Sequence, residues 1–93
     1  MRRRSIIQQE KKCLLCGATY GCELHHCIHG TAGRKIADKL GLTVWLCAEH
    51  HRGKVSPHQN RAIDLRLKRL AQTEYEKKHT REEWLEKVGR NYL

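Results

Sequence analysis

Two short motifs of cysteine and histidine constrain this chain more than any other feature of its sequence. The first is Cys13-x-x-Cys16, and residues 17–46 separate it from the second, Cys47-x-x-His50. Each pair can bind one metal ion through a tight turn, and two pairs supply the four ligands of a tetrahedral zinc ion. Because all four ligands come from the protein, the sequence predicts a closed, structural zinc site.

The composition explains why a chain of this length needs such a site. It has 93 residues, of which 39% are hydrophobic, and no Phe. A core this poor in large side chains is usually reinforced by disulfides, a metal ion or a partner. Five cysteines cannot all form disulfides with one another, so we interpret the clustered Cys and His residues as metal ligands. The remaining Cys22 and Cys27 are interpreted as small buried side chains, with competition for the metal, or replacement of His50 as a ligand, as the alternatives.

The charge of the chain indicates the kind of partner it meets. Lys and Arg number 19 against 10 Asp and Glu, which gives a net charge of +9. A small domain this basic favours a polyanionic partner, most often nucleic acid, and a lysine-rich soluble surface is the alternative. No apolar run approaches the ~20 residues of a membrane-spanning helix. Only Ile6 and Ile7 follow the first arginines, where an export signal has about 7–15 apolar residues, so we expect a cytoplasmic protein with reduced thiols.

We expect three segments along the chain. Residues 1–12 form a basic N-terminal arm. Residues 13–58 contain every Cys and all of the His except His79, and they are predicted to form the zinc-bound core. Residues 59–93 are predicted to form a helical extension that packs on this core.

Local patterns predict the secondary structure of the core. In chain order the predicted elements are a tight turn at Cys13–Gly17, a strand over residues 23–28, a glycine loop over residues 30–33, a helix over residues 34–40 closed by Gly41, a strand over residues 42–46, and a helical turn that begins at Cys47.

The extension is predicted to contain two helices. Ser56, Pro57 and Gln59 are typical of a helix start, and that helix is expected to run to about His79. Its apolar stripe consists of Ile63, Leu67, Leu70, Ala71 and Tyr75. A second helix is expected to begin with a Thr80–Glu83 capping box, to carry Trp84, Leu85 and Val88 on one side, and to end at Gly89.

Two histidine pairs, His25-His26 and His50-His51, add chemistry that a structural zinc site does not need. Neighbours on a helix point about 100° apart, so His51 is free to point elsewhere if His50 binds the zinc. Neighbours on a strand point to opposite faces, although at a strand end both can line one cleft. Phosphodiester hydrolysis needs a base that titrates near neutrality and a divalent cation at the phosphate. We therefore expect a second centre built from the histidines.

The order of these motifs resembles the HNH endonuclease family, which has a ββα-metal fold. The resemblance is carried by the CxxCG motif at Cys13, by His25-His26 followed by a glycine loop, and by the Leu-Cys-x-x-His-His motif over residues 46–51. It covers residues 13–58, and small phage-encoded members, including the recombination-enhancement nuclease group, are the most similar. The fold that it implies is α+β: a small zinc-stabilised ββα-metal domain with appended C-terminal helices.

The resemblance also implies roles for single residues. His26 would be the general base, and His25, His51 and His58 would bind a catalytic divalent cation, Mg²⁺ or another. The spacing of seven residues between His51 and His58 exceeds the usual four. Residues 42–46 contain no Asn, whereas the family has an Asn near this point that orients the base. Basic residues beside this centre are expected to contact nucleic acid: Arg34, Lys35, Arg52 and Lys54.

The sequence thus predicts a metal-dependent endonuclease that acts on DNA, with double-stranded DNA as the expected substrate. The alternatives are a non-catalytic, zinc-stabilised DNA-binding module and an adaptor that binds a phage or host protein through its C-terminal helices. The surplus histidines favour the enzyme. Other expected partners are recombination or packaging proteins of a phage or its host and a second copy of the chain, in the cytoplasm of a bacterial host with the gene carried by a phage or prophage.

Overall fold

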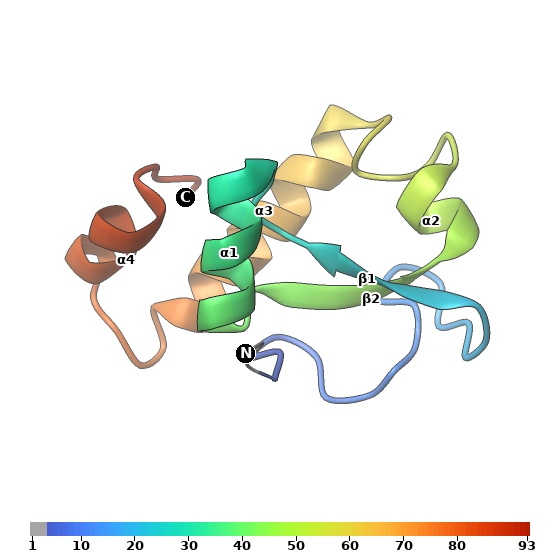
Figure 1. The fold of residues 1–93 in the computed structure, drawn as a ribbon, viewed down its shortest axis with the longest axis horizontal. Coiled ribbons are helices and arrows are strands. Elements are labelled where there is room, and N and C mark those ends of the chain that lie inside the picture. Colours follow the sequence, from blue (N-terminus) through green and yellow to red (C-terminus); the bar gives the residue numbers. More distant parts are fainter. Residues whose placement is uncertain (1–3) are drawn as a thin grey trace.

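The computed structural model describes residues 4–93, in which helices accompany a two-stranded antiparallel sheet (Figure 1). This confirms the mixed α+β class. The first three residues of the predicted basic arm lie outside the described range. The elements in chain order are β1 (Cys22–His26), α1 (Gly30–Leu40), β2 (Thr43–Cys47), α2 (Ala48–Arg52), α3 (Arg61–Tyr75) and α4 (Arg81–Val88).

The sheet has one buried and one partly exposed face. β1 pairs with β2 so that His25 lies opposite Val44, and both side chains are buried. Leu24 lies opposite Trp45, and both are half-buried. Because side chains alternate along a strand, these two pairs occupy opposite faces of the sheet. The strands therefore present one histidine to the core and an apolar pair to the other side.

Helix α1 begins earlier than the sequence patterns predict. Its first residue is Gly30 rather than Arg34, so the predicted glycine loop forms the first turn of the helix. Gly33 is buried against Ile28, and a Cβ atom at this position would lie 3.0 Å from Cγ2 of Ile28. This glycine therefore permits close packing of the helix rather than a turn. The predicted end is confirmed, since Gly41 caps the helix with a φ of 76°.

Helix α3 begins at Arg61, so the predicted start near Ser56 is wrong. The side-chain oxygen of Asn60 accepts hydrogen bonds from the backbone N–H groups of Ala62 and Ile63, at 3.0 and 3.2 Å. These two bonds satisfy donors at the helix start and fix it there. The carbonyl of Ser56 instead accepts the N–H of Asn60 at 2.8 Å, which holds residues 56–60 in a turn.

The predicted end of this helix is also too late, because α3 stops at Tyr75. The ring of His79 folds back and stacks on Tyr75, with the ring centroids 4.3 Å apart. The Thr80 capping box that begins α4 is confirmed: the Thr80 hydroxyl accepts the N–H of Glu83, and the Glu83 carboxylate accepts the N–H of Thr80. Helix α4 ends at Gly89 as predicted.

One hydrophobic cluster joins the strands to α1, α3 and α4. Its fully buried members are Cys13, Cys27, Ile28, Ala37, Leu42, Val44, Leu46, Leu67, Ala71, Tyr75 and Trp84. The predicted stripe on α3 therefore supplies three core residues, whereas Ile63 and Leu70 are half-buried. The C-terminal tail packs back onto α3, since the Tyr92 N–H donates to the side-chain oxygen of Gln72 at 2.8 Å.

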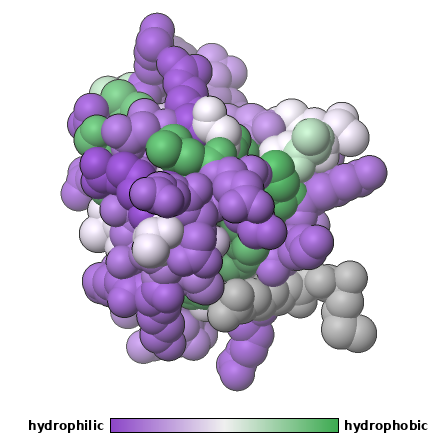
Figure 2. All heavy atoms as spheres, turned by 90° about the vertical axis from the view of Figure 1, so that its left-hand side faces the viewer, coloured by the Kyte–Doolittle hydropathy of each residue, from purple (hydrophilic) through white to green (hydrophobic). Residues whose placement is uncertain are grey.

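The surface over α4 is largely hydrophilic, and its hydrophobic area is broken into small regions (Figure 2). Leu85 is 40% exposed although its neighbour Trp84 is fully buried, so the two do not share a buried side as predicted. Adjacent helical side chains diverge by about 100°, which explains the difference. Within residues 4–93, no helix is both long and apolar enough to cross a membrane.

Candidate metal centres

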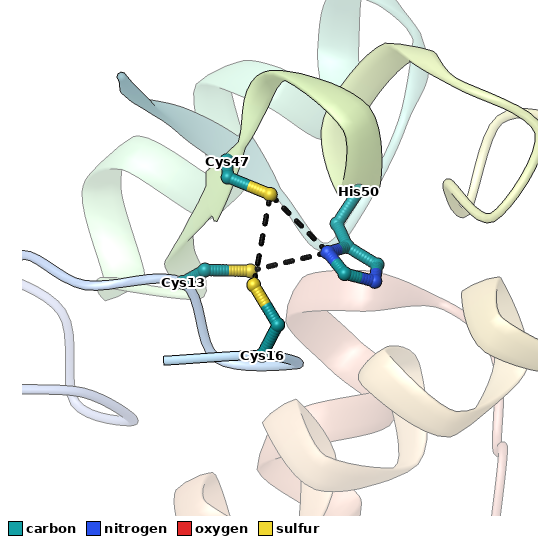
Figure 3. Close-up of side chains that lie close together, drawn as sticks. All are labelled: Cys13, Cys16, Cys47 and His50. Carbon is teal, nitrogen blue, oxygen red and sulfur yellow. Dashed lines mark hydrogen bonds between the residues drawn. The ribbon is translucent and has the colours of Figure 1, made fainter. Parts of the chain in front are cut away.

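The four predicted zinc ligands lie together (Figure 3). Cys13 and Cys16 come from the loop before β1, Cys47 ends β2, and His50 lies on α2. The sulfur of Cys16 is 3.8 Å from that of Cys47, and Nδ1 of His50 is 3.6 Å from the Cys13 sulfur and 3.2 Å from the Cys47 sulfur. Zinc–sulfur bonds of about 2.3 Å at tetrahedral angles separate two sulfurs by about 3.8 Å. The geometry is therefore consistent with structural zinc.

The electrostatics of this cluster also suit a cation. Burial opposes ionisation of Cys13, but backbone N–H groups, that of Cys47 first, outweigh it and lower the pKa of Cys13 to about 6. The N–H of Ala18 favours the Cys16 thiolate, but the neighbouring sulfurs of Cys13 and Cys47 outweigh this and raise the pKa of Cys16. The thiols lie so close together that ionisation of one disfavours ionisation of its neighbours. A bound zinc ion offsets this repulsion between thiolates.

The two remaining cysteines lie outside this cluster, but only one of them is buried as predicted. Cys27 is fully buried in the core, and burial raises the pKa of its thiol to about 12. Cys22 is only half-buried, and its thiol donates a hydrogen bond to the carbonyl of Ala18 at 3.1 Å. Neither replaces His50 beside the other three sulfurs.

A second cluster contains the three histidines expected to bind a catalytic cation. His25, His51 and His58 each place a ring nitrogen within 4.8 Å of the others. Nε2 of His25 is buried and has no hydrogen-bond partner within the described chain. Burial first, and then the neighbouring histidines, lower the pKa of His25 to about 3. A neutral imidazole with a buried, unpartnered nitrogen is suited to bind a metal ion.

His51 is oriented by a carboxylate that the sequence patterns did not single out. Oε1 of Glu23 on β1 lies 2.7 Å from Nδ1 of His51, and Oε2 of the same residue lies 2.7 Å from the Arg52 guanidinium. The hydrogen bond with His51 is the main cause that lowers the pKa of Glu23. A carboxylate at Nδ1 fixes the ring and leaves Nε2 for a metal ion, as is typical of histidine ligands.

His26, the expected general base, lies at the end of β1. It points to the face of the sheet opposite His25, yet both rings line the same cleft because the strand stops there. Nε2 of His26 lies 2.8 Å from the Oδ1 of Asp38 on α1. Since a carboxylate accepts hydrogen bonds, Nε2 is the donor, and Nδ1 is left to accept a proton. No local sequence pattern identifies Asp38 as the partner of His26.

A further group beside His25 was also missed. Nε2 of His29 is hydrogen-bonded to Oδ1 of Asp64 on α3, and the Lys68 ammonium lies 2.8 Å from Oδ2 of the same carboxylate. Burial opposes ionisation of Asp64, but Lys68 and His29 outweigh it and lower the pKa of this carboxyl. His25, His29 and Asp64 place one donor atom each within 4.8 Å of one another. The imidazole cluster therefore continues toward α3.

The histidines line a cleft of about 410 Å³. Of the four basic residues expected to contact nucleic acid, Arg34 lines this cleft. Arg52 is held by Glu23, and Lys35 and Lys54 are exposed outside it. None of the residues found to line the cleft is acidic, among those that the structure describes: Leu24, His25, His26, His29, Gly30, Arg34, His51 and His58.

The donor set decides which ion this cleft suits. Three imidazoles favour an ion of intermediate softness such as Zn²⁺, Ni²⁺ or Fe²⁺. Mg²⁺ is hard, prefers oxygen ligands and keeps most of its water. The three histidines therefore do not fit Mg²⁺, the ion first expected from the family resemblance.

Comparisons of the chain with known protein families, with characterised proteins and with solved structures find no match.

Proposed function

We propose that this protein is a metal-dependent nuclease that hydrolyses phosphodiester bonds in DNA, in the manner of an HNH endonuclease. One observation carries the proposal. A histidine whose Nε2 is held by a carboxylate, His26 with Asp38, lines the same cleft as the cluster of His25, His51 and His58. This arrangement supports His26 as a general base beside residues able to bind a divalent cation, the two components that phosphodiester hydrolysis needs.

In this proposal His26 activates the water. Its Nδ1 takes a proton as the water oxygen bonds to phosphorus, and the bond between phosphorus and the leaving oxygen breaks. The leaving oxygen takes a proton from solvent, so a phosphate monoester and a hydroxyl are formed. Asp38 is a positioning residue, because it acts through its hydrogen bond to the base: it fixes the tautomer and stabilises the positive charge that His26 gains. It thereby takes over the orienting role that the resemblance gives to an Asn.

The cation held by the three histidines stabilises negative charge on the phosphate oxygens when bound. Because its ligands are imidazoles, we propose Ni²⁺ or a second Zn²⁺ as the ion that supports cleavage. Arg34 lines the same cleft and supplies a fixed positive charge to the phosphate.

The zinc site supports this arrangement mechanically. Helix α2 has only five residues, and an isolated helix this short is unstable. It carries His50 of the zinc cluster and His51 of the second cluster side by side. A zinc ion bound through Cys47 and His50 therefore holds the helix that presents His51 to the cleft.

The test is the cleavage of supercoiled plasmid by zinc-loaded protein with Ni²⁺, Zn²⁺ or Mg²⁺ added. We expect single-strand nicks with the imidazole-binding ions and little cleavage with Mg²⁺ alone. His26→Ala is expected to lower the rate by about 100-fold or more, since general-base catalysis typically contributes 10²–10⁴. The matched control is His79→Ala, which removes a histidine that stacks on Tyr75 outside the cleft.

Two results would contradict the proposal. Equal nicking by the wild type and His26→Ala would remove His26 from the reaction. Plasmid binding without cleavage under any of the three ions would instead favour the DNA-binding module, in which the basic cleft binds a phosphate without hydrolysing it.

A further inference from the structure

A second hollow adjoins the histidine cleft on the exposed face of the sheet. It has a volume of about 210 Å³ and shares Leu24 with the cleft. Its floor is the cross-strand pair Leu24 and Trp45, and the segment before the zinc ligands forms its wall. The lining residues are Arg4, Ser5, Gln8, Gln9, Lys11, Leu24, Thr43 and Trp45.

The wall of this hollow is fixed by hydrogen bonds to β2 and its flank. The N–H of Trp45 donates to the side-chain oxygen of Gln8 at 2.8 Å, and the N–H of Leu14 donates to the carbonyl of Trp45 at 2.9 Å. The N–H of Ile6 donates to the carbonyl of Gly41 at 2.9 Å. These bonds hold the N-terminal segment against the edge of the sheet.

The charge of the hollow matches that of the cleft. Arg4 and Lys11 line it, and none of its described lining residues is acidic. Arg34 lines the adjoining cleft, which likewise has no acidic lining residue in the described chain. The carboxylates nearest the cleft, Asp38, Glu23 and Asp64, are each hydrogen-bonded to a histidine, so the cations that line the two hollows suit a chain of phosphates.

Trp45 gives this surface an aromatic ring on which a planar group can stack. Its side chain is half-buried on the outer face of the sheet, and the Lys11 ammonium lies 4.7 Å from the ring centroid. The Lys11 side chain, and not the core, therefore lies over one face of the indole. The second tryptophan, Trp84, is fully buried and donates its ring N–H to the Arg90 carbonyl.

We infer that this surface, the Trp45 strip (Arg4, Lys11, Leu24 and Trp45), binds a single-stranded segment of nucleic acid that leads into the histidine cleft. A base stacks on the indole of Trp45 in place of the Lys11 ammonium, and Lys11 and Arg4 then meet the adjacent phosphates. A base in a duplex is already stacked on its neighbours, so an indole selects an unpaired strand. That the bound strand is a substrate rests on the proposed function, but its binding can be measured without cleavage.

The experiment measures the anisotropy of a labelled oligothymidylate of about 12 nucleotides with zinc-loaded protein and no added second ion. Trp45→Leu is expected to weaken binding by about 10-fold or more, because one stacked base typically contributes that much to affinity. The control is Tyr20→Leu, which removes an aromatic ring that is 82% exposed and outside the strip, and it should bind as the wild type does. Thermal unfolding of both variants establishes that each is folded.

Two further measurements sharpen the test. Lys11→Ala is expected to bind more weakly at low salt and to show a smaller dependence on salt, because it removes one phosphate contact. In a Trp84→Phe background, the fluorescence of Trp45 should be quenched by the oligothymidylate and much less by a hairpin duplex of the same length. If that background does not fold, the anisotropy of the labelled duplex gives the same comparison.

The outcomes separate this inference from the proposed function. Unchanged oligothymidylate binding by Trp45→Leu overturns the inference, even if the plasmid is nicked. Duplex binding that is as tight as single-strand binding, and equally weakened by Trp45→Leu, overturns the selection for an unpaired strand. Weakened binding by Trp45→Leu in a protein that cleaves nothing supports the strip and contradicts only the proposed nuclease.

Discussion

Replacing Cys13 by Ser is the most stringent test of the zinc site. Cys13 has two roles, because it is one of the four clustered ligands and is also 1% exposed within the hydrophobic core. Its sulfur lies 3.6 Å from Nδ1 of His50, so the change removes one donor that links the N-terminal turn to α2. Serine fits the same space but is a poor zinc ligand at neutral pH.

The free energy that the domain is expected to lose without zinc is comparable to its whole net stability. Structural zinc sites in small domains contribute about 10–16 kcal/mol of apparent binding free energy near pH 7, and this is coupled to folding. The net stability of a domain is only about 5–15 kcal/mol. This protein has a two-stranded sheet and a single core cluster, so we place it toward the lower end. Even a partial loss of about 4 kcal/mol would lower its Tm by roughly 16–32 °C.

The assay combines zinc content with thermal unfolding followed by circular dichroism. Wild-type protein should contain one tightly bound structural zinc ion per chain and unfold in one transition, whereas Cys13→Ser should lack that ion and lose helix at or near room temperature. The matched control is Cys22→Ser, since the thiol of Cys22 donates to backbone carbonyls outside the zinc cluster and this variant should keep its zinc. A chelator should give the wild type the properties of Cys13→Ser.

The reasoning is refuted if Cys13→Ser keeps stoichiometric zinc, or if it loses zinc and still melts within a few degrees of the wild type. The first result would show that the cluster is not the zinc site. The second would show that the core alone holds the fold.

Three other changes have defined outcomes. Trp84→Ala should lower the free energy of unfolding by about 3–5 kcal/mol in urea titrations, because it removes the largest fully buried side chain and leaves a cavity. Burial raises the pKa of Cys27 from its ordinary value of 9.0 to about 12, so stability should fall as pH rises above 9, by about 1 kcal/mol at pH 10, and Cys27→Ala should abolish this pH dependence. Asp38→Asn should slow plasmid nicking by about 10-fold, with zinc content unchanged, and should have little further effect in a His26→Ala background; independent, multiplying effects would show that Asp38 does not act through His26.

The zinc cluster could be predicted because its information is local. Each pair of ligands lies within four residues, so a single turn aims both side chains at one point whatever the rest of the chain does. The caps at Thr80 and Gly41 were equally local and were also predicted. The predicted helix start at Ser56 was wrong because Asn60, which the sequence patterns did not single out as a cap, accepts two backbone N–H groups and fixes the start at Arg61.

The partners that orient the histidines could not be predicted, because tertiary packing brings them together. Glu23 reaches His51 across 28 positions of sequence, and Asp64 reaches His29 across 35. Asp38 meets His26 only because α1 packs against β1. A lone carboxylate on a strand or helix has no local pattern that distinguishes it from a solvated charge. The prediction that three histidines share a second centre depended on the family resemblance, and the structure brings their rings together.

The proposed nuclease requires a second ion in the histidine cleft, separate from the structural zinc, that supports cleavage. The most direct measurement is Ni²⁺-dependent nicking of supercoiled plasmid by His51→Ala, with zinc content determined on the same sample. We predict that His51→Ala keeps one zinc ion per chain, because His50 and the three cysteines are intact, but loses nicking at every Ni²⁺ concentration that supports the wild type. Nicking at the wild-type rate, with the same dependence on Ni²⁺, would contradict the claim.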